Sequence, residues 1–203
     1  MAFSQSALQA ELYSVFNSMT DGDNHKFSKG ISDAFKNFVD SGKPQTTDSG
    51  SIPTGTFTGA STDGSMTSDS SGCESIIQTA CEAMVDGSKS NDYIAEKIAE
   101  GLQDLTDGTE VNTSVSGTTV PPVPPPPTIP TSGSAKGGID CDTSPVEAGL
   151  KACFSAMVDM TEGGNMYFAS ELARLTYTCL TSGTVNTDGV GNLEGSKGVG
   201  NAS

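Results

Sequence analysis

The single histidine of the chain, His25, is the only imidazole available for acid–base or nucleophilic chemistry. It follows the run Asp21-Gly22-Asp23-Asn24, which resembles the start of a calcium loop, where alternate side-chain oxygens face one ion. The rest of that pattern is missing, because Ser32 stands where a bidentate Glu belongs and the sixth position is not glycine. We therefore expect a helix–helix turn with an N-cap here, and neither a metal site nor a catalytic site.

The cysteines are the other residues with reactive side chains. They are odd in number, form no C-x-x-C pair and lie far in sequence from His25, so they do not fit a tetrahedral zinc site. In helices, cysteine is usually a small buried hydrophobe, and a disulfide between Cys153 and Cys179 is the alternative. The five are Cys73, Cys81, Cys141, Cys153 and Cys179. No nucleophile, phosphate-loop or dinucleotide motif accompanies them, and we expect no cofactor and no enzymatic activity.

Two kinds of segment have the composition of a binding motif. The β-prone stretches Val111-Asn112-Thr113 and Val185-Asn186-Thr187 are too short to be stable strands alone, but each could add to a sheet edge of a partner. The proline run from Val120 to Pro127 includes Pro124 and Pro125 and predicts a stiff polyproline II rod. Such a rod either spaces two units or docks in an aromatic groove, and the absence of flanking Arg or Lys favours the spacer.

These segments follow helices that the chain repeats three times. An apolar i, i+3, i+4, i+7 pattern ends at a methionine, an acidic residue and glycine in each copy, which predicts three related helices. Their predicted buried faces are Leu12, Val15, Phe16 and Met19; Ile77, Ala80, Cys81 and Met84; and Leu150, Cys153, Phe154 and Met157.

A second amphipathic stretch follows each turn and stops at glycine, so each copy predicts a helical hairpin. These second faces are Phe27, Ile31, Ala34 and Phe38; Ile94, Ile98, Gly101 and Leu105; and Phe168, Leu172, Leu175 and Cys179. A lone hairpin buries too little surface to fold well. The three hairpins must therefore pack on one another in a pseudo-threefold body, or on neighbouring chains.

The predicted fold class is mainly α, with six helices in three hairpins, each followed by an extended irregular or short β tail. The predicted organisation places hairpins at 1–50, 73–115 and 145–187, a Gly/Ser/Thr linker at 51–72, a Pro/Gly-rich linker at 116–144 and a Gly-rich C-terminal tail at 188–203. The composition agrees with small packed units, because only 34% of the residues are hydrophobic.

The charge of the chain restricts its partners. A formal net charge of -15 repels a phosphate backbone and an anionic membrane surface, so we expect no direct nucleic-acid partner and no membrane partner. The N-terminal residues lack a basic segment followed by an apolar one, which indicates synthesis in a cytosol without Sec export.

The helical hairpins, the Ser-Gly stops, the Val-Asn-Thr segment and the glycine-punctuated tail together resemble small repeat-containing virion structural proteins of tailed bacteriophages. Leu12 to Met19, Phe27 to Val39 and Ser182 to Thr187 carry the resemblance. It implies a non-catalytic structural component of a particle, in the capsid decoration, neck or tail. Its partners would be other virion proteins or copies of itself, in a multimeric assembly within the virion. The alternative is a soluble multivalent scaffold that recruits partners through its proline-rich segment.

Overall fold

The computed structural model describes residues 3–19, 23–85, 87, 89–122 and 127–202, and the order helix, helix, strand, strand occurs three times in it. The helices are α1 (Gln5–Asn17), α2 (Asn24–Asp40), α3 (Ser71–Met84), α4 (Asn91–Asp107), α5 (Ser144–Met157) and α6 (Gly164–Ser182). The strands are β1 (Gln45–Ile52), β2 (Gly55–Thr67), β3 (Glu110–Val120), β4 (Ile129–Asp140), β5 (Thr184–Val190) and β6 (Ser196–Asn201), with a short 3₁₀ turn η1 (Gly191–Leu193) before β6.

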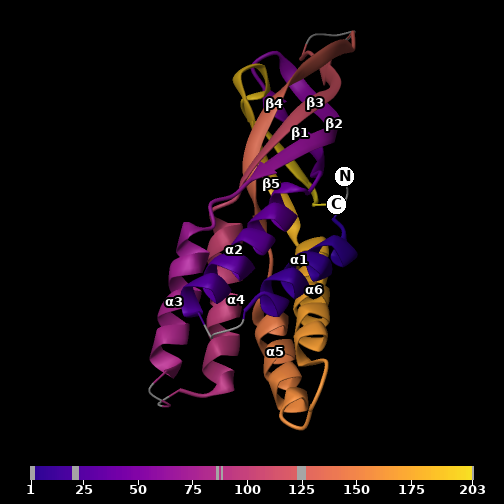
Figure 1. The fold of residues 1–203 in the computed structure, drawn as a ribbon. Coiled ribbons are helices and arrows are strands. Elements are labelled where there is room, and N and C mark those ends of the chain that lie inside the picture. The colour runs from indigo at the N-terminus through magenta and orange to yellow at the C-terminus, as the bar shows by residue number, and fades with distance from the viewer. Residues whose placement is uncertain (1–2, 20–22, 86, 88, 123–126, 203) are drawn as a thin grey trace.

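The helices form one half of an elongated molecule and the strands form the other (Figure 1). Each helix packs against its neighbours in chain order, and α6 packs against α1, so the three hairpins close into a ring. Of the two packing arrangements left open by the sequence, the chain therefore uses the one in which its own hairpins pack together.

Six helices form where the sequence predicted them, and their predicted apolar faces are buried or pack on the core, although Met19 lies beyond the end of α1. Leu12, Ile77 and Leu150 are fully enclosed in the first helices of the three units, and Ile31, Ile98 and Leu172 are fully enclosed in the second. One continuous apolar cluster joins all six helices and reaches the lower end of the strands. Each hairpin thereby buries the face that it could not bury alone.

The predicted fold class was wrong in its treatment of the segments after the hairpins. They are the six antiparallel strands of a closed barrel, in which each strand pairs with the next and β6 pairs back with β1. The expected linker at 51–72 contains β2, the expected linker at 116–144 contains β4, and the expected tail at 188–203 contains β6. The chain is thus six helices plus a six-stranded barrel, not mainly α with short tails.

The barrel has a polar layer between two apolar layers. Its lower end is filled by Met66, Val111, Ile139 and Val185, which belong to the helical core. Its upper end is filled by a separate cluster of Ile52, Phe57, Val115, Ala135 and Leu193. Between them lie the buried polar residues Thr46, Asp48, Ser61, Thr113 and Thr187. Because small and polar side chains fill much of the interior, these strands lack the alternation of apolar and polar residues that marks most barrels.

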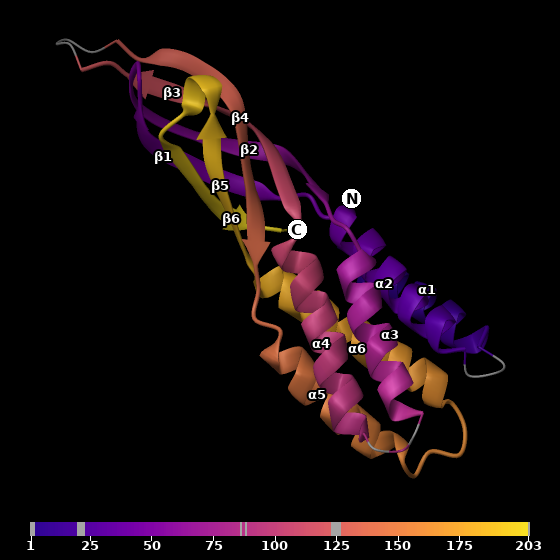
Figure 2. The ribbon, with the colours of Figure 1, turned by 90° about the vertical axis from the view of Figure 1, so that its left-hand side faces the viewer.

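The two views place both ends of the chain at the waist, where barrel and helices meet (Figures 1 and 2). The β-hairpins point away from the helices, and the β3–β4 hairpin extends farther than the other two (Figure 2). Among the described residues, no helix combines the length and the apolar character needed to cross a membrane.

Candidate functional site

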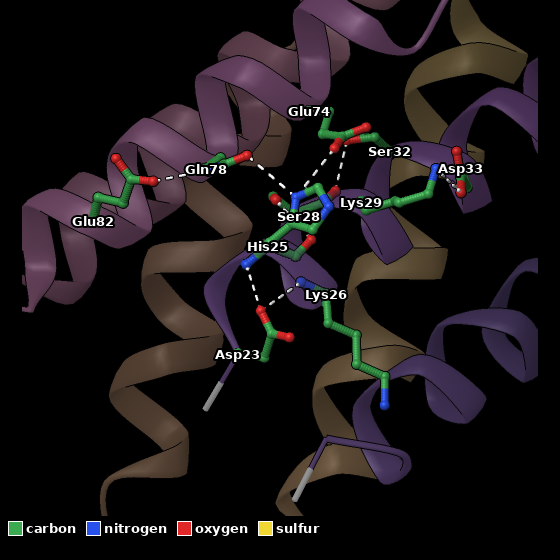
Figure 3. A network of polar contacts seen from close by, with 10 residues as sticks. All are labelled: Asp23, His25, Lys26, Ser28, Lys29, Ser32, Asp33, Glu74, Gln78 and Glu82. Carbon is green, nitrogen blue, oxygen red and sulfur yellow. Dashed lines mark hydrogen bonds and ion pairs between the residues drawn. The ribbon is translucent and has the colours of Figure 1, made fainter. Parts of the chain in front are cut away.

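His25 lies on the first turn of α2 and faces α3 of the next unit (Figure 3). Its Nδ1 is 3.4 Å from Glu74 Oε1 and 3.4 Å from Gln78 Oε1. Gln78 in turn donates from Nε2 to Glu82 Oε1 at 3.0 Å. Both neighbours of Nδ1 are oxygen acceptors, so these contacts are hydrogen bonds in the tautomer that carries its proton on Nδ1. The histidine therefore connects unit 1 to a row of polar side chains on unit 2.

A shallow polar groove of about 430 Å³ runs along the face of α3 next to His25. It is lined by Ser71, Glu74, Ser75, Gln78, Thr79 and Glu82. The hydroxyls of α2 near the histidine are used elsewhere, since Ser28 donates to the His25 carbonyl and Ser32 donates to the Ser28 carbonyl. Within the described residues, the network therefore joins an imidazole to acceptors and not to a hydroxyl nucleophile. It links the start of α2 in unit 1 to α3 in unit 2.

The acidic turn before His25 is only partly described, because Asp21 and Gly22 lie outside the described residues. Asp23 Oδ1 accepts from the backbone N–H groups of His25 and Lys26, at 3.0 and 3.2 Å. The predicted N-cap is thus confirmed. In the part of the chain that the structure describes, no group of three or more His, Cys, Asp or Glu side chains is arranged to hold a metal ion.

All five cysteines are free thiols, so the alternative Cys153–Cys179 disulfide is not present. Burial raises the pKa of Cys73 to about 12 and the pKa values of Cys81 and Cys153 to about 11. Cys179 instead lies against Cys141, in a contact that raises the pKa of Cys179 and lowers that of Cys141. Four of the five thiols are therefore held in their protonated, weakly nucleophilic form.

The two Val-Asn-Thr segments begin strands of the barrel. Their valines and threonines, Val111, Thr113, Val185 and Thr187, point inward and are buried. Asn112 and Asn186 lie on the outer face, where Asn112 is half-buried and Asn186 is exposed. Both segments pair on both sides, β3 with β2 and β4, and β5 with β4 and β6. Since neither offers a free edge, strand addition at these residues has no template.

Pro124 and Pro125 lie outside the described residues, together with the centre of the predicted proline rod. The described residues on either side show what this segment connects. Val120 ends β3 and Ile129 begins β4, so the proline run joins two adjacent barrel strands and does not space two helical units.

The tip of the barrel is the surface that the sequence did not reveal. Residues 49–60 and 115–135, in the outer parts of the β1–β2 and β3–β4 hairpins, contain no charged side chain, and the β5–β6 turn carries the exposed carboxylate Glu194, although the whole chain carries -15. A groove of about 370 Å³ opens there, lined by residues of all three β-hairpins that include Pro53, Ile129 and Asn192. The exposed side chains of Val120, Ile129 and Val190 lie on the same part of the barrel.

The opposite end of the molecule is also partly apolar. Val85 and Val158 occupy matching positions after α3 and α5 and are about three-quarters exposed, at 76% and 74%. A groove of about 330 Å³ between α1 and the α5–α6 loop is lined by Tyr13, Met160 and Met166 among others.

Comparison with known proteins adds no relative: no family model, no curated protein and no solved structure matches this chain.

Proposed function

We propose that this protein is a non-catalytic structural component of a bacteriophage particle, and that it binds neighbouring virion proteins or further copies of itself. The observation that carries the proposal is the closure of three related units into one ring of helices and one barrel. One chain thereby has the arrangement that a cyclic trimer would have. A threefold repeated surface fits positions where three equivalent neighbours meet in a symmetric assembly.

The differences between the two ends support an oriented component. The barrel tip carries three hairpins, has exposed apolar side chains and is nearly uncharged, with Glu194 in the β5–β6 turn, which suits contact with another protein. Most acidic residues lie on the helices and their loops, where like charge between copies disfavours non-specific association. In this arrangement the tip binds the particle and the helical end faces outward or toward the next component.

The barrel also changes how such a protein would attach. The strands are closed on themselves, so their affinity for a partner would come from side chains at the tip and not from added backbone pairing. The β3–β4 hairpin breaks the threefold equivalence, since only it carries the proline run. The three units would make similar contacts with three equivalent neighbours, and the β3–β4 hairpin would make one contact that the other two hairpins cannot make.

The test is to purify phage particles from cells that produce this protein, and to look for the protein in them by cross-linking mass spectrometry and electron microscopy. We expect stoichiometric amounts in particles and cross-links from residues near the barrel tip to another virion protein or another copy. Absence of the protein from purified particles would overturn the proposal. A free chain that binds proline-recognition domains through residues 120–127 would support the soluble-scaffold alternative.

A further inference from the structure

The polar layer inside the barrel is centred on a carboxyl group that has no access to solvent. Asp48 points inward from β1 and has an exposed fraction of 0%. Thr46 Oγ1 donates to Asp48 Oδ2 at 2.7 Å, and Thr187 Oγ1 donates to Asp48 Oδ1 at 3.4 Å. Each carboxyl oxygen thus has a threonine hydroxyl within hydrogen-bond distance, and neither contact comes from a basic side chain.

The surrounding hydroxyls come from equivalent places in the three units. Thr113 and Thr187 each follow a buried valine by two residues at the start of β3 and β5, and Thr46 follows buried Pro44 in the same way. Side chains two apart on a strand share a face, so all three threonines point into the barrel. The closed strand order therefore arranges three hydroxyls around the interior at corresponding positions of the strands.

Register connects these hydroxyls into one layer. Gly198 of β6 lies between Asp48 on one side and Thr187 on the other, and a Cβ at Gly198 would be 2.2 Å from Asp48 Oδ1 and 2.4 Å from Thr187 Oγ1. Ser61 Oγ lies 3.0 Å from Thr46 Oγ1, and Ser61 pairs with Val115, two residues along β3 from Thr113. The polar side chains of this layer therefore come from β5, β1, β2 and β3, and Gly198 of β6 leaves room between Asp48 and Thr187.

Thr113 provides an independent sign of a ligand. Its side chain is 3% exposed, and its Oγ1 is buried with no hydrogen-bond partner in the described structure. A buried hydroxyl without a hydrogen-bond partner destabilises the folded state unless a ligand supplies the partner. The carboxyl of Asp48 has no basic neighbour, and a bound cation is the partner that would compensate a negative charge there.

We infer that the polar layer is a binding site for one dehydrated monovalent cation, with sodium as the ion to test. The ligands are oxygen atoms of Asp48, Thr46, Thr187 and Thr113, which is the donor type that hard cations take. One carboxylate balances one positive charge. Calcium sites in proteins use more carboxylate charge than this layer has, and transition metals prefer the nitrogen and sulfur ligands that it lacks.

The experiment measures thermal unfolding of the full chain in sodium chloride, potassium chloride and choline chloride at equal ionic strength. Choline is too large to enter the barrel. For wild-type protein we expect the midpoint in sodium to exceed that in choline by roughly 3–6 °C when sodium is at ten times its Kd, and to rise with sodium concentration. Equal midpoints in all three salts would overturn the proposal, as would stabilisation by calcium that sodium does not give.

Variants assign the effect to the layer. Asp48→Asn keeps the size of the side chain and removes its charge, so it should abolish the difference between sodium and choline. Asp188→Asn is the matched control, because Asp188 is an exposed carboxylate on β5 that pairs with Lys197, and it should keep the difference. If Asp48→Asn does not fold, Thr113→Val removes the unpartnered hydroxyl at nearly constant volume and should reduce the sodium dependence. A full sodium dependence in Asp48→Asn or in Thr113→Val would overturn the assignment.

Sodium-23 NMR gives a direct readout. The sodium signal should broaden on addition of wild-type protein and of Asp188→Asn, and should stay narrow with Asp48→Asn. A signal that broadens equally with all three proteins would place the ion on the acidic surface and overturn the inference.

Discussion

Asp40 Oδ1 accepts two hydrogen bonds from Ser68, one from its backbone N–H and one from its hydroxyl, each at 2.8 Å. Asp40 ends α2, and Ser68 is the residue after β2, so this contact joins the helical half to the barrel where unit 1 passes into unit 2. At the next passage, Cys141 follows β4, and its Sγ lies 3.7 Å from Thr106 Oγ1 near the end of α4. At both junctions, a residue at the end of the second helix of a unit thus contacts the residue that follows the second strand, although the side chains differ.

Removal of the Asp40 carboxylate should destabilise the waist. Asp40→Ala leaves the nearly buried N–H and hydroxyl of Ser68 without their acceptor, which typically costs about 1–3 kcal/mol. Urea unfolding followed by circular dichroism measures the change. The control is Asp33→Ala, which removes an exposed ion pair with Lys29 and should change stability little. Equal effects of the two variants would show that the Ser68 contact contributes nothing specific.

Two adjacent glycines of β4 provide a test of the barrel's close strand approach. A Cβ at Gly137 would lie 1.8 Å from the backbone oxygen of Asn186, whereas the nearest atom to a Cβ at Gly138 is 3.5 Å away. Gly137→Ala should therefore force the β4–β5 pair apart and cost about 3 kcal/mol or more, and Gly138→Ala should be tolerated. Thermal unfolding of both variants distinguishes them. A stable Gly137→Ala protein would contradict the described register.

The helices could be predicted because each has an apolar stripe at a period of 3.6 residues. The barrel could not, because its inward positions include Thr46, Asp48 and Thr187, which have the composition of a flexible tail. Its closure also depends on pairing β1 with β6, at opposite ends of the chain. A period of two was present at Val111, Thr113 and Val115, and it is the signal that would have indicated a half-buried strand.

The candidate site was predictable to a similar extent. The N-cap at Asp23 followed from local turn chemistry, which depends on neighbouring residues only. The contact of His25 with Glu74, and the groove at the barrel tip, both require segments from different units to meet. No spacing within one unit specifies such a meeting.

Stability should fall in acid through two aspartates that precede helices. The N–H and hydroxyl of Ser71 lower the pKa of Asp69, and the hydroxyl and N–H of Ser144 lower the pKa of Asp142. A lowered folded-state pKa means that the unfolded chain binds more protons, so this contribution is complete above the unfolded pKa and is lost as the pH falls through the folded value.

The corresponding measurement is the unfolding midpoint between about pH 6 and pH 3. The double variant Asp69→Asn/Asp142→Asn should lose less stability over this range than wild type does. Asp33→Asn is the control, because Asp33 pairs with Lys29 and not with a helix N-terminus, and it should follow the wild-type curve. If the double variant follows wild type as well, the two hydrogen bonds do not contribute to acid sensitivity.

The proposed role predicts that the barrel tip, and not the helical end, determines association with particles. Ile129→Lys and Val190→Lys each place a positive charge on an exposed apolar position of the tip and should reduce the amount of protein that copurifies with particles by roughly tenfold or more. Val85→Lys is the matched change at the helical end and should have little effect. Quantitative mass spectrometry of purified particles measures all three. A larger loss for Val85→Lys would reverse the proposed orientation.

The ends of the chain lie at the waist, as the two internal junctions do. A circular permutation that begins the chain with another unit should therefore be tolerated. Ser68, Cys141 and Ala202 each follow the second strand of a unit, and all three are buried. A permutant that joins residue 203 to residue 1 through a short Gly/Ser linker and opens between Cys141 and Asp142 should fold cooperatively, with a midpoint near that of the unpermuted chain. A permutant opened between Val115 and Ser116 cuts the paired strand β3 and should fail. The two permutants differ little in chain entropy, so a difference between them reports the position of the opening. If both fail to fold, the junctions are not equivalent, and unit 1 must precede unit 2 for the ring to close.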